Sequence, residues 1–456
     1  MNKTADTAAP QTGCSRHIAN TGSDELVLCP HCDLSQYLPL LAPGEEAHCL
    51  RCQHQLDARQ HNPVMRPALY AGSALLMLVL ANLFPFVSMA IAGNRSEIHF
   101  FDTSAVLFTE YQQVLAILIW LFIQAVPAFC MLAVIYLKLG MRYPLPARIW
   151  VARVLYMLKP WSMVDIFLMG LLISFVKLVA TAEISLGMSF WAFCLFCLLH
   201  LRTFQVLDRH ALWASIAPSP QPAAPINAGS TGLQQQLKLC QCCTAVVPLQ
   251  QRQCSRCHTR VTARIPASLQ KTLALLVTAC VLYIPANILP IMRTVSFGEV
   301  TDSTIISGFI LMWQDGEYPV AIVIFLASVV IPIVKIVVMF WLCYLAGATR
   351  QIGGKYSGNV YRLVDWVGRW SMVDVLVVAF MAALVRFGLL ASVYPGIGAV
   401  LFAAVVITTM LAAVSFDPRL LWDNQQGDNQ QRDDQQGDNQ QGDNRFSNRT
   451  AEGVTT

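Results

Sequence analysis

Charged side chains are scarce in this chain. Asp, Glu, Lys and Arg together make up 13% of its 456 residues, whereas a soluble domain carries about 25%. Apolar residues reach 55%, and the mean hydropathy is +0.51. Most side chains must therefore face something other than water, which predicts a membrane protein. The formal net charge of +4 is too small to indicate a nucleic-acid partner.

Signatures of catalysis and of secretion are missing as well. The sequence contains no Walker loop and no paired-carboxylate or nucleophile motif, so we expect neither an enzyme nor a pump that hydrolyses ATP by itself. The first 60 residues are polar and rich in cysteine, which does not fit a cleavable signal peptide. We therefore expect the protein to enter the membrane through its own helices.

The sequence contains long apolar stretches. Crossing about 30 Å of hydrocarbon takes about 20 apolar residues, and such segments must be helical because lipid offers the backbone no other partners. Eight stretches qualify: 68–92, 114–138, 163–182, 188–208, 271–292, 319–345, 371–392 and 396–416.

The loops between these stretches differ in charge. Two of them are basic, with Arg142, Arg148, Arg153 and Lys159 in the first and Arg350, Lys355, Arg362 and Arg369 in the second. The loops on the opposite side are mainly acidic, with Glu97, Asp102, Glu110, Glu299, Asp302, Asp315 and Glu317. Because Lys and Arg concentrate in cytoplasmic loops, we expect both termini and both cysteine clusters on the cytoplasmic side of a bacterial inner membrane.

The two halves of the chain repeat one another. Landmarks of the first half recur about 205 to 209 positions later: Asn82 as Asn287, Pro85 as Pro290, Pro127 as Pro332, and WSMVD at 161–165 letter for letter at 370–374. Four spans in each unit give both units the same orientation, which predicts a parallel repeat about an axis along the membrane normal. The prolines are candidates for helix kinks, with Asn82 and Asn287 able to satisfy a freed carbonyl.

Each unit is preceded by four cysteines in two Cys-x2-Cys pairs. Cys29 and Cys32 are followed by Cys49 and Cys52, and the second set is Cys240, Cys243, Cys254 and Cys257. Two residues between thiolates let one tight turn present both sulfurs to a single tetrahedral ion. The spacing predicts two structural ribbons with one Zn²⁺ each; iron suits four thiolates too but is less favoured. Cys242 is a spare thiol that could replace a neighbouring ligand.

Ionisable groups inside the predicted spans are costly and therefore candidates for function. Lys335 in the sixth span and Asp374 in the seventh are predicted to pair, with Ser371 nearby, as a protonatable or gating element; the first half has Cys130 in place of the lysine. Two further pairs of residues are candidates for a transport or gating role, each with a purely structural alternative. Ser162 and Asp165 also fit a capping box, and Lys177 and Arg386 also fit side chains that snorkel to the membrane interface.

These observations predict an α-helical polytopic membrane protein made of two four-helix units, each preceded by a small cytoplasmic zinc ribbon. The expected divisions are a disordered extension (1–24), ribbon 1 (25–60), unit 1 (66–213), a proline-rich linker (214–236), ribbon 2 (237–264), unit 2 (268–422) and a disordered Gln/Asn-rich tail (423–456).

The segments ANLFPF and PANILPI and the doubled WSMVD resemble the paraquat-inducible protein A family, over nearly all of residues 25–422. The resemblance implies a stress-inducible inner-membrane component of an envelope transport system. Such a protein would pass phospholipid or another hydrophobic molecule to a periplasmic tunnel formed by an MCE-domain protein, sometimes with an outer-membrane lipoprotein, and so contribute to envelope integrity. Two alternatives stay open: a membrane thiol redox protein that uses its Cys-x2-Cys pairs, and a passive anchor for the MCE partner.

Overall fold

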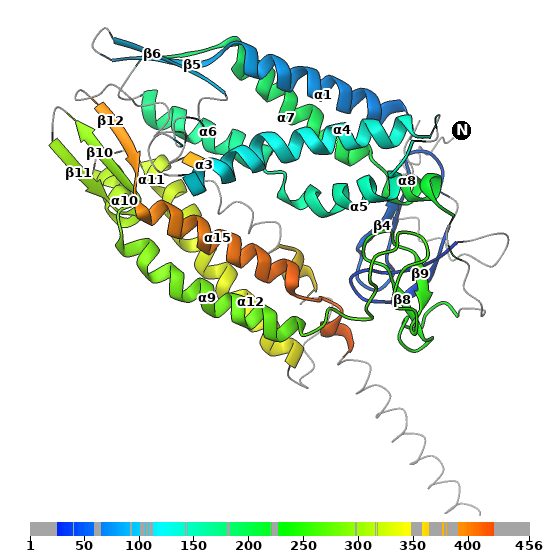
Figure 1. The fold of residues 1–456 in the computed structure, drawn as a ribbon. Coiled ribbons are helices and arrows are strands. Elements are labelled where there is room, and N and C mark those ends of the chain that lie inside the picture. Colours follow the sequence, from blue (N-terminus) through cyan, green and yellow to red (C-terminus); the bar gives the residue numbers. More distant parts are fainter. Residues whose placement is uncertain are drawn as a thin grey trace, which may run out of the picture.

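The computed structural model describes two helical units, two small ribbons and two small sheets (Figure 1). The described residues are 25–39, 41–58, 65–91, 94–100, 105, 108, 113–141, 143, 145–179, 183–218, 220, 227–296, 299–314, 316, 318–347, 358–363, 376–377, 380 and 391–423. The predicted N-terminal extension, most of the seventh span (371–392) and nearly all of the predicted tail lie outside them.

Unit 1 is built from helices that follow the predicted spans. They are α1 (Met65–Leu83), α3 (Gln113–Ile119) with the π-helix η1 (Trp120–Ala125) and α4 (Val126–Leu139), α5 (Arg148–Leu158) with the 3₁₀ turn η2 (Lys159–Trp161) and α6 (Val164–Val179), and α7 (Met188–Val206), followed by α8 (Arg209–Ile216). Helices α1 and α7 pack along their lengths, and α4 packs on α1.

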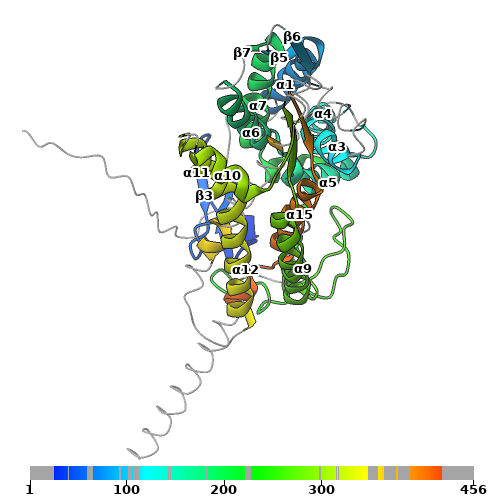
Figure 2. The same ribbon diagram turned by 90° about the vertical axis from the view of Figure 1, so that its left-hand side faces the viewer.

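Unit 2 repeats this order. It comprises α9 (Ser268–Ile288), α10 (Ile305–Gln314), α11 (Tyr318–Phe325) with the π-helix η3 (Leu326–Val330) and α12 (Ile331–Gly347), and α15 (Ile397–Ser415). Figure 2 shows the two units side by side. Within the described part of the chain, seven helices are long and apolar enough to cross a membrane. They correspond to seven of the eight predicted spans.

Two three-stranded antiparallel sheets lie at the end of the units away from the ribbons (Figure 1). Their strands are β5 (Pro85–Ile91), β6 (Asn94–His99) and β7 (Glu183–Leu186) in unit 1, and β10 (Met292–Ser296), β11 (Glu299–Ser303) and β12 (Ala391–Pro395) in unit 2. We call this the sheet end and the opposite one the ribbon end. The predicted spans 68–92 and 271–292 therefore extend too far, because α1 ends at Leu83 and α9 at Ile288, before strands β5 and β10 begin.

The two sheets share one topology and one register. Strand orders are β6-β5-β7 and β11-β10-β12. Val87 lies opposite Leu186, and the corresponding Met292 lies opposite Pro395. The internal repeat therefore extends from the helices to individual strand pairs.

The repeated prolines occupy two kinds of position. Pro127 and Pro332 are each the second residue of a helix that directly follows a π-helical segment. A proline has no N–H and its ring clashes with the carbonyl four residues earlier, and the wider π-turn accommodates both effects. Pro85 and Pro290 instead lie beyond the ends of α1 and α9, so they end these helices rather than bend them.

The repeated asparagines bond within their own helices. Asn82 Nδ2 donates to Leu78 O at 2.8 Å, and Asn287 Nδ2 donates to Tyr283 O at 2.8 Å. Each amide caps the carbonyl four residues earlier in the last turn. The carbonyl that Pro85 would leave without a donor is that of Ala81, whereas Asn82 donates to that of Leu78. The asparagines therefore do not bond the carbonyls that the sequence analysis expected.

A glycine directly precedes α7 and α15, the last long helix of each unit, and lies against the backbone at the start of β5 or β10. Gly187 N donates to Phe86 O at 3.1 Å, and Gly396 N donates to Ile291 O at 2.9 Å. A Cβ at Gly187 would lie 1.9 Å from Pro85 O, and one at Gly396 would lie 2.1 Å from Pro290 O. The junction between sheet and helix therefore requires glycine in both units.

Replacing either glycine by alanine should loosen its sheet from its helix. We expect Gly187→Ala and Gly396→Ala each to destabilise the protein by about 1–3 kcal/mol through overpacking, seen as a lower thermal unfolding temperature of the purified chain. Gly72→Ala in α1 is the matched control, because nothing lies within 4 Å of the added Cβ. Equal unfolding temperatures for all three variants would contradict this account.

Candidate functional site

Four Cys-x2-Cys turns of identical backbone geometry form the ribbon end. In the first, Cys29 N donates to Leu34 O at 3.0 Å and Asp33 N donates to Cys29 O at 2.9 Å. The other three repeat both bonds. The residue after each second cysteine adopts a positive φ of 55° to 58°, in Asp33, Gln53, Thr244 and His258. This left-handed step turns the chain so that both sulfurs face the same point.

The structure brings the eight predicted cysteines together in two buried groups of four. In ribbon 1 (residues 25–58) the strands are β1 (Glu25–Leu28), β2 (Ser35–Leu38), β3 (Glu46–His48) and β4 (Gln55–Ala58); in ribbon 2 (residues 237–261) they are β8 (Leu237–Leu239) and β9 (Val246–Pro248). The thiol of Cys242 is not part of either group.

The sulfur positions suit a tetrahedral ion. Cys29 Sγ lies 3.4 Å from Cys52 Sγ, and Cys240 Sγ lies 3.5 Å from Cys257 Sγ. Four sulfurs at the Zn–S distance of about 2.3 Å would lie about 3.8 Å apart. Both groups therefore fit a bound metal with all four positions taken by protein, which gives a structural site with no place for substrate.

Each ribbon docks on the unit of the other half of the chain. Ribbon 1 contacts unit 2: Arg362 Nη2 donates to Cys52 O at 3.2 Å, and the Arg51 guanidinium lies 4.5 Å from the centroid of the Trp422 ring. Arg264, which leads into unit 2, forms ion pairs with Asp33 at 2.9 Å and with Asp423 at 2.7 Å.

Ribbon 2 contacts unit 1 in the corresponding way. Arg153 donates to Cys257 O, and Arg209 Nη2 donates to Cys242 O at 2.6 Å. Arg153 and Arg362 occupy equivalent positions 209 residues apart, and so do the last cysteines of the two ribbons, 205 residues apart. The two arginines of the basic loops thus hold the metal turns of opposite ribbons.

The ribbons also contact each other. Ser35 N donates to Ser230 O at 2.9 Å, and Gly229 N donates to Ser35 O at 2.9 Å. Leu28 of ribbon 1 packs with Leu237, Leu239 and Val246 of ribbon 2. Residues 227–232, part of the segment predicted as a linker, therefore join the ribbons into one body at the ribbon end.

Two histidines lie where ribbon 1 meets unit 2. The rings of His31 and His54 are 3.9 Å apart, and the ring of His31 lies 6.4 Å from that of Tyr361. Burial and the neighbouring His54 lower the pKa of His31 to about 3. Burial and nearby Arg362 lower the pKa of His54 to about 4. Both rings are therefore neutral at pH 7.

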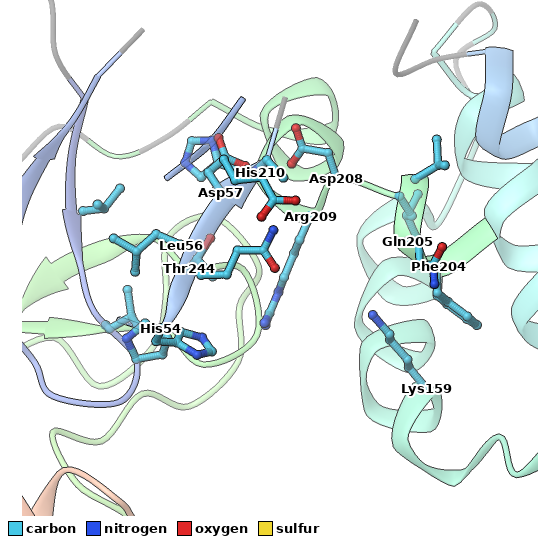
Figure 3. A pocket seen from close by; sticks show the side chains of 18 of the residues that line it. His54, Leu56, Asp57, Lys159, Phe204, Gln205, Asp208, Arg209, His210 and Thr244 are labelled. Atoms are coloured by element: carbon cyan, nitrogen blue, oxygen red, sulfur yellow. Dashed lines mark hydrogen bonds between the residues drawn. The ribbon is translucent and has the colours of Figure 1, made fainter. Parts of the chain in front are cut away.

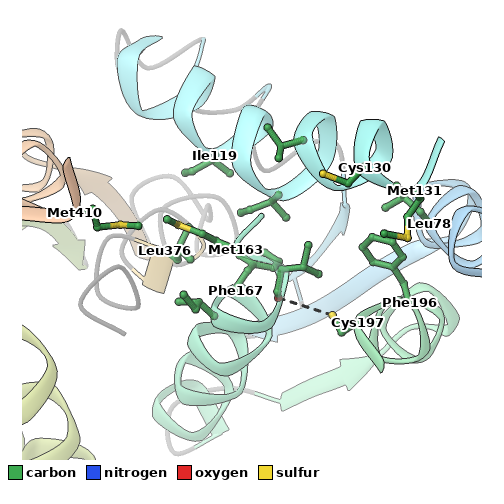
Figure 4. Close-up of a cluster of buried hydrophobic side chains, with 14 of the residues drawn as sticks. Leu78, Ile119, Cys130, Met131, Met163, Phe167, Phe196, Cys197, Leu376 and Met410 are labelled. Atoms are coloured by element: carbon green, nitrogen blue, oxygen red, sulfur yellow. Dashed lines mark hydrogen bonds between the residues drawn. The ribbon is translucent and has the colours of Figure 1, made fainter. Parts of the chain in front are cut away.

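The two units share one apolar core between the ribbon and sheet ends (Figure 4). Met163 and Phe167 of unit 1 lie beside Leu376 and Met410 of unit 2. The ring of Phe380 is 5.8 Å from that of Phe175. The units are thus packed against each other inside the membrane as well as joined by the ribbons.

A polar contact inside unit 1 includes one predicted residue and one that the sequence analysis missed. Ser162 Oγ lies 2.9 Å from Nε2 of the buried His200 in α7. Helix α6 begins at Val164, so Ser162 stands outside the N-cap position and its hydroxyl faces α7. Asp165 lies in the first turn of α6. A lone histidine in an apolar span was a usable signal, because ionisable groups there are costly.

The protonatable or gating element predicted in unit 2 lies only partly within the described residues. Lys335 in α12 is 4% exposed. Asp374, Ser371 and Arg386 lie outside the described residues, so the pairing of Lys335 with Asp374 stays a prediction. Of Lys177, the structure describes the backbone, which lies in α6.

Comparison with known proteins was made on the whole chain. The sequence model of the family described as paraquat-inducible protein A matches residues 64–217 and 269–426, once in each unit. The chain belongs to the paraquat-inducible protein A family. It is a multi-pass membrane protein of the bacterial envelope, with two repeated helical units and two four-cysteine ribbons.

Similar proteins carry names that refer to intermembrane transport or to an envelope-spanning tunnel. The chain is 48% identical to the intermembrane transport protein PqiA of Escherichia coli strain K12 over 399 residues, 88% of this chain and 96% of that protein. It is 30% identical to the lipophilic envelope-spanning tunnel protein A of the same organism, over 87% of this chain and 90% of that protein. A probable intermembrane transport protein of Haemophilus influenzae is 29% identical, over 87% and 96% of the two chains. No solved structure matches the chain significantly.

The crossed arrangement of the ribbons makes a specific prediction for hydrogen exchange. Removing the arginine that holds a metal turn should loosen the opposite half's ribbon. We expect Arg362→Gln to raise amide exchange in ribbon 1 and leave ribbon 2 protected, and Arg153→Gln to do the reverse, measured by mass spectrometry of the whole chain. Faster exchange in the ribbon of the arginine's own half would contradict the crossed docking.

Proposed function

We propose that the chain is the inner-membrane subunit of an envelope transport system that passes phospholipid or another hydrophobic molecule to a periplasmic tunnel. The tunnel would be an MCE-domain protein, sometimes joined by an outer-membrane lipoprotein. The observation that carries the proposal is family membership of both units, with relatives named for intermembrane transport at 48% identity.

The distribution of charge supports an orientation for this subunit. Arg148, Arg153 and Arg362 lie at the ribbon end, whereas Glu299 and Asp302 lie on strands of the sheet end. By the preference of Lys and Arg for cytoplasmic loops, the ribbons and both termini would face the cytoplasm. The two sheets would then face the periplasm, where the tunnel protein would dock.

The ribbons would each hold one Zn²⁺ in a purely structural role. Four thiolates close the coordination shell, and zinc suits such a site because it has no redox chemistry. Metal binding supplies folding energy that so small a ribbon cannot obtain from an apolar core. A thiol redox function would need these same sulfurs free, so tightly bound zinc argues against it.

Metal content tests this assignment. We expect two zinc ions per purified chain, and one in the Cys52→Ser and Cys257→Ser variants, because three thiolates hold the ion far less tightly. Elemental analysis of the purified protein gives the ratio directly, with Cys280→Ser in α9 as the control that should keep both ions. A wild-type chain without metal, but with thiols that cycle between oxidised and reduced forms, would favour the redox alternative.

Transport itself is tested by reconstitution with the tunnel partner. Labelled phospholipid should move between vesicles only when both proteins are present, and Lys335→Gln should slow the movement severalfold because an intramembrane cation is removed. Lys271→Gln, at the exposed start of α9, is the matched control and should keep full transport.

The possible outcomes of this experiment separate transport from passive anchoring. No lipid movement by the wild-type pair, with partner binding intact, would identify a passive anchor. Movement unaffected by Lys335→Gln would remove Lys335 from the predicted protonatable or gating element.

A further inference from the structure

A cavity of about 570 Å³ lies where ribbon 1, ribbon 2 and unit 1 meet (Figure 3). One wall is ribbon 1, with His54, Leu56 and Asp57. The facing wall is the ribbon end of unit 1, with Lys159 and Phe204, and the connection between α7 and α8 closes one side. This volume lies in the range of small-molecule sites.

The cavity lies at the level of a membrane surface. Helix α7 is one of the candidate spans and ends at Val206, and the cavity is lined by residues of its last turns, Arg202, Phe204 and Gln205. The lining mixes charged groups with apolar side chains such as Leu56 and Phe204. A polar cavity with apolar walls at this depth matches the head of an amphiphile better than a fully soluble polyanion.

The charges of the cavity are separated between its walls. On the helix wall, Lys159 extends toward the ribbon, with its Nζ 5.0 Å from the centroid of the Phe204 ring. Away from Lys159, Asp57 of ribbon 1 and Asp208 of the connection between α7 and α8 lie close together, with His210 beside them (Figure 3). Burial and the adjacent Asp208 charge raise the pKa of Asp57. The His210 ring lowers this pKa in part, and a bound cation would stabilise the two carboxylates further.

The other ionisable lining groups do not erase this separation. They are Glu46, His54, Arg202, Arg209 and His210. The guanidinium of Arg209 lies 4.8 Å from the centroid of the Tyr156 ring and donates to Cys242 O at 2.6 Å, so it serves ribbon 2. Arg202 lies on the helix wall with Lys159 and donates to Gln205 Oε1 at 3.0 Å. Glu46 lies on the ribbon wall with Asp57, 3.5 Å from His48. Both charges have the sign of their own wall.

We propose that this cavity binds a phosphate group linked to an ammonium group, as in the head of a zwitterionic phospholipid. The phosphate lies toward Lys159 and Arg202, and the ammonium lies toward Asp57 and Asp208. The same chemistry occurs in a free phosphoethanolamine derivative. The idea that a bound lipid is cargo rests on the proposed transport function. Binding of the headgroup at this site does not depend on that function.

Native mass spectrometry of the full chain in detergent tests the proposal with defined probes. The probes are phosphatidylethanolamine, phosphatidylglycerol and diacylglycerol. We expect phosphatidylethanolamine to bind best and diacylglycerol, which lacks phosphate, to bind at background level. Lys159→Gln should weaken phosphatidylethanolamine about tenfold, as expected for loss of a charge-assisted contact, and Lys159→Arg should restore it.

Asp57→Asn tests the other wall. It should remove the preference for phosphatidylethanolamine over phosphatidylglycerol, because only the former carries an ammonium, while leaving phosphatidylglycerol binding unchanged. Lys271→Gln is the matched control, since it removes one exposed cation from the ribbon end of unit 2. Zinc content and unfolding temperature equal to those of the wild type establish that each variant is folded.

Competition identifies the source of the ligand. If soluble glycerophosphoethanolamine displaces the lipid at equal concentration, the site holds a free phosphoester; if it does not, the site holds lipid. Equal binding of phosphatidylethanolamine by Lys159→Gln and wild type, or binding of diacylglycerol as tight as that of phosphatidylethanolamine, overturns the proposal. Lost vesicle transfer with intact headgroup binding would overturn the transport function and leave this site standing.

Discussion

Four buried thiols converging on one point are the constraint on which the ribbon end depends. Thiols gathered this closely suit a bound ion, and the left-handed residue after each second cysteine aims both sulfurs at it. The same turns present backbone carbonyls outward, and Arg153 and Arg362 bind those of Cys257 and Cys52. Metal binding is thereby linked to how the two halves of the chain are held together.

The crossed docking, in which each ribbon is bound by the unit of the other half, explains why the duplicated chain keeps two ribbons instead of one. Each ribbon precedes its own unit in sequence, and its last metal turn is bound by an arginine of the other unit. Among the described residues of the sheet end, strands pair within one unit, β5 with β7 and β10 with β12. The contact between units there is one of side chains, with the ring of Phe86 in β5 lying 6.4 Å from that of Phe380. The units are therefore joined at the ribbon end and through the core, while each sheet belongs to its own unit.

Much of this architecture could be predicted from the sequence because its signals are local. Cys-x2-Cys spacing marks the metal groups, and apolar length marks the spans. The strands were missed because Pro85–Ile91 is as apolar as the helix before it, and hydropathy alone does not separate the end of a span from a strand. The crossed docking was missed because Arg153 is equally compatible with either ribbon until the chain is folded. The contact of Ser162 with His200 joins residues 38 positions apart, beyond any spacing rule.

The central claim is that each metal-bound ribbon is held by the opposite unit. An electron cryo-microscopy map of the full chain in a lipid nanodisc tests it most directly. The account predicts tetrahedral metal density within each group of four cysteines, with ribbon 1 seated on Arg362 and Trp422 and ribbon 2 on Arg153. A map with ribbon 1 seated on Arg153, or with cysteine groups that hold no metal, would contradict it.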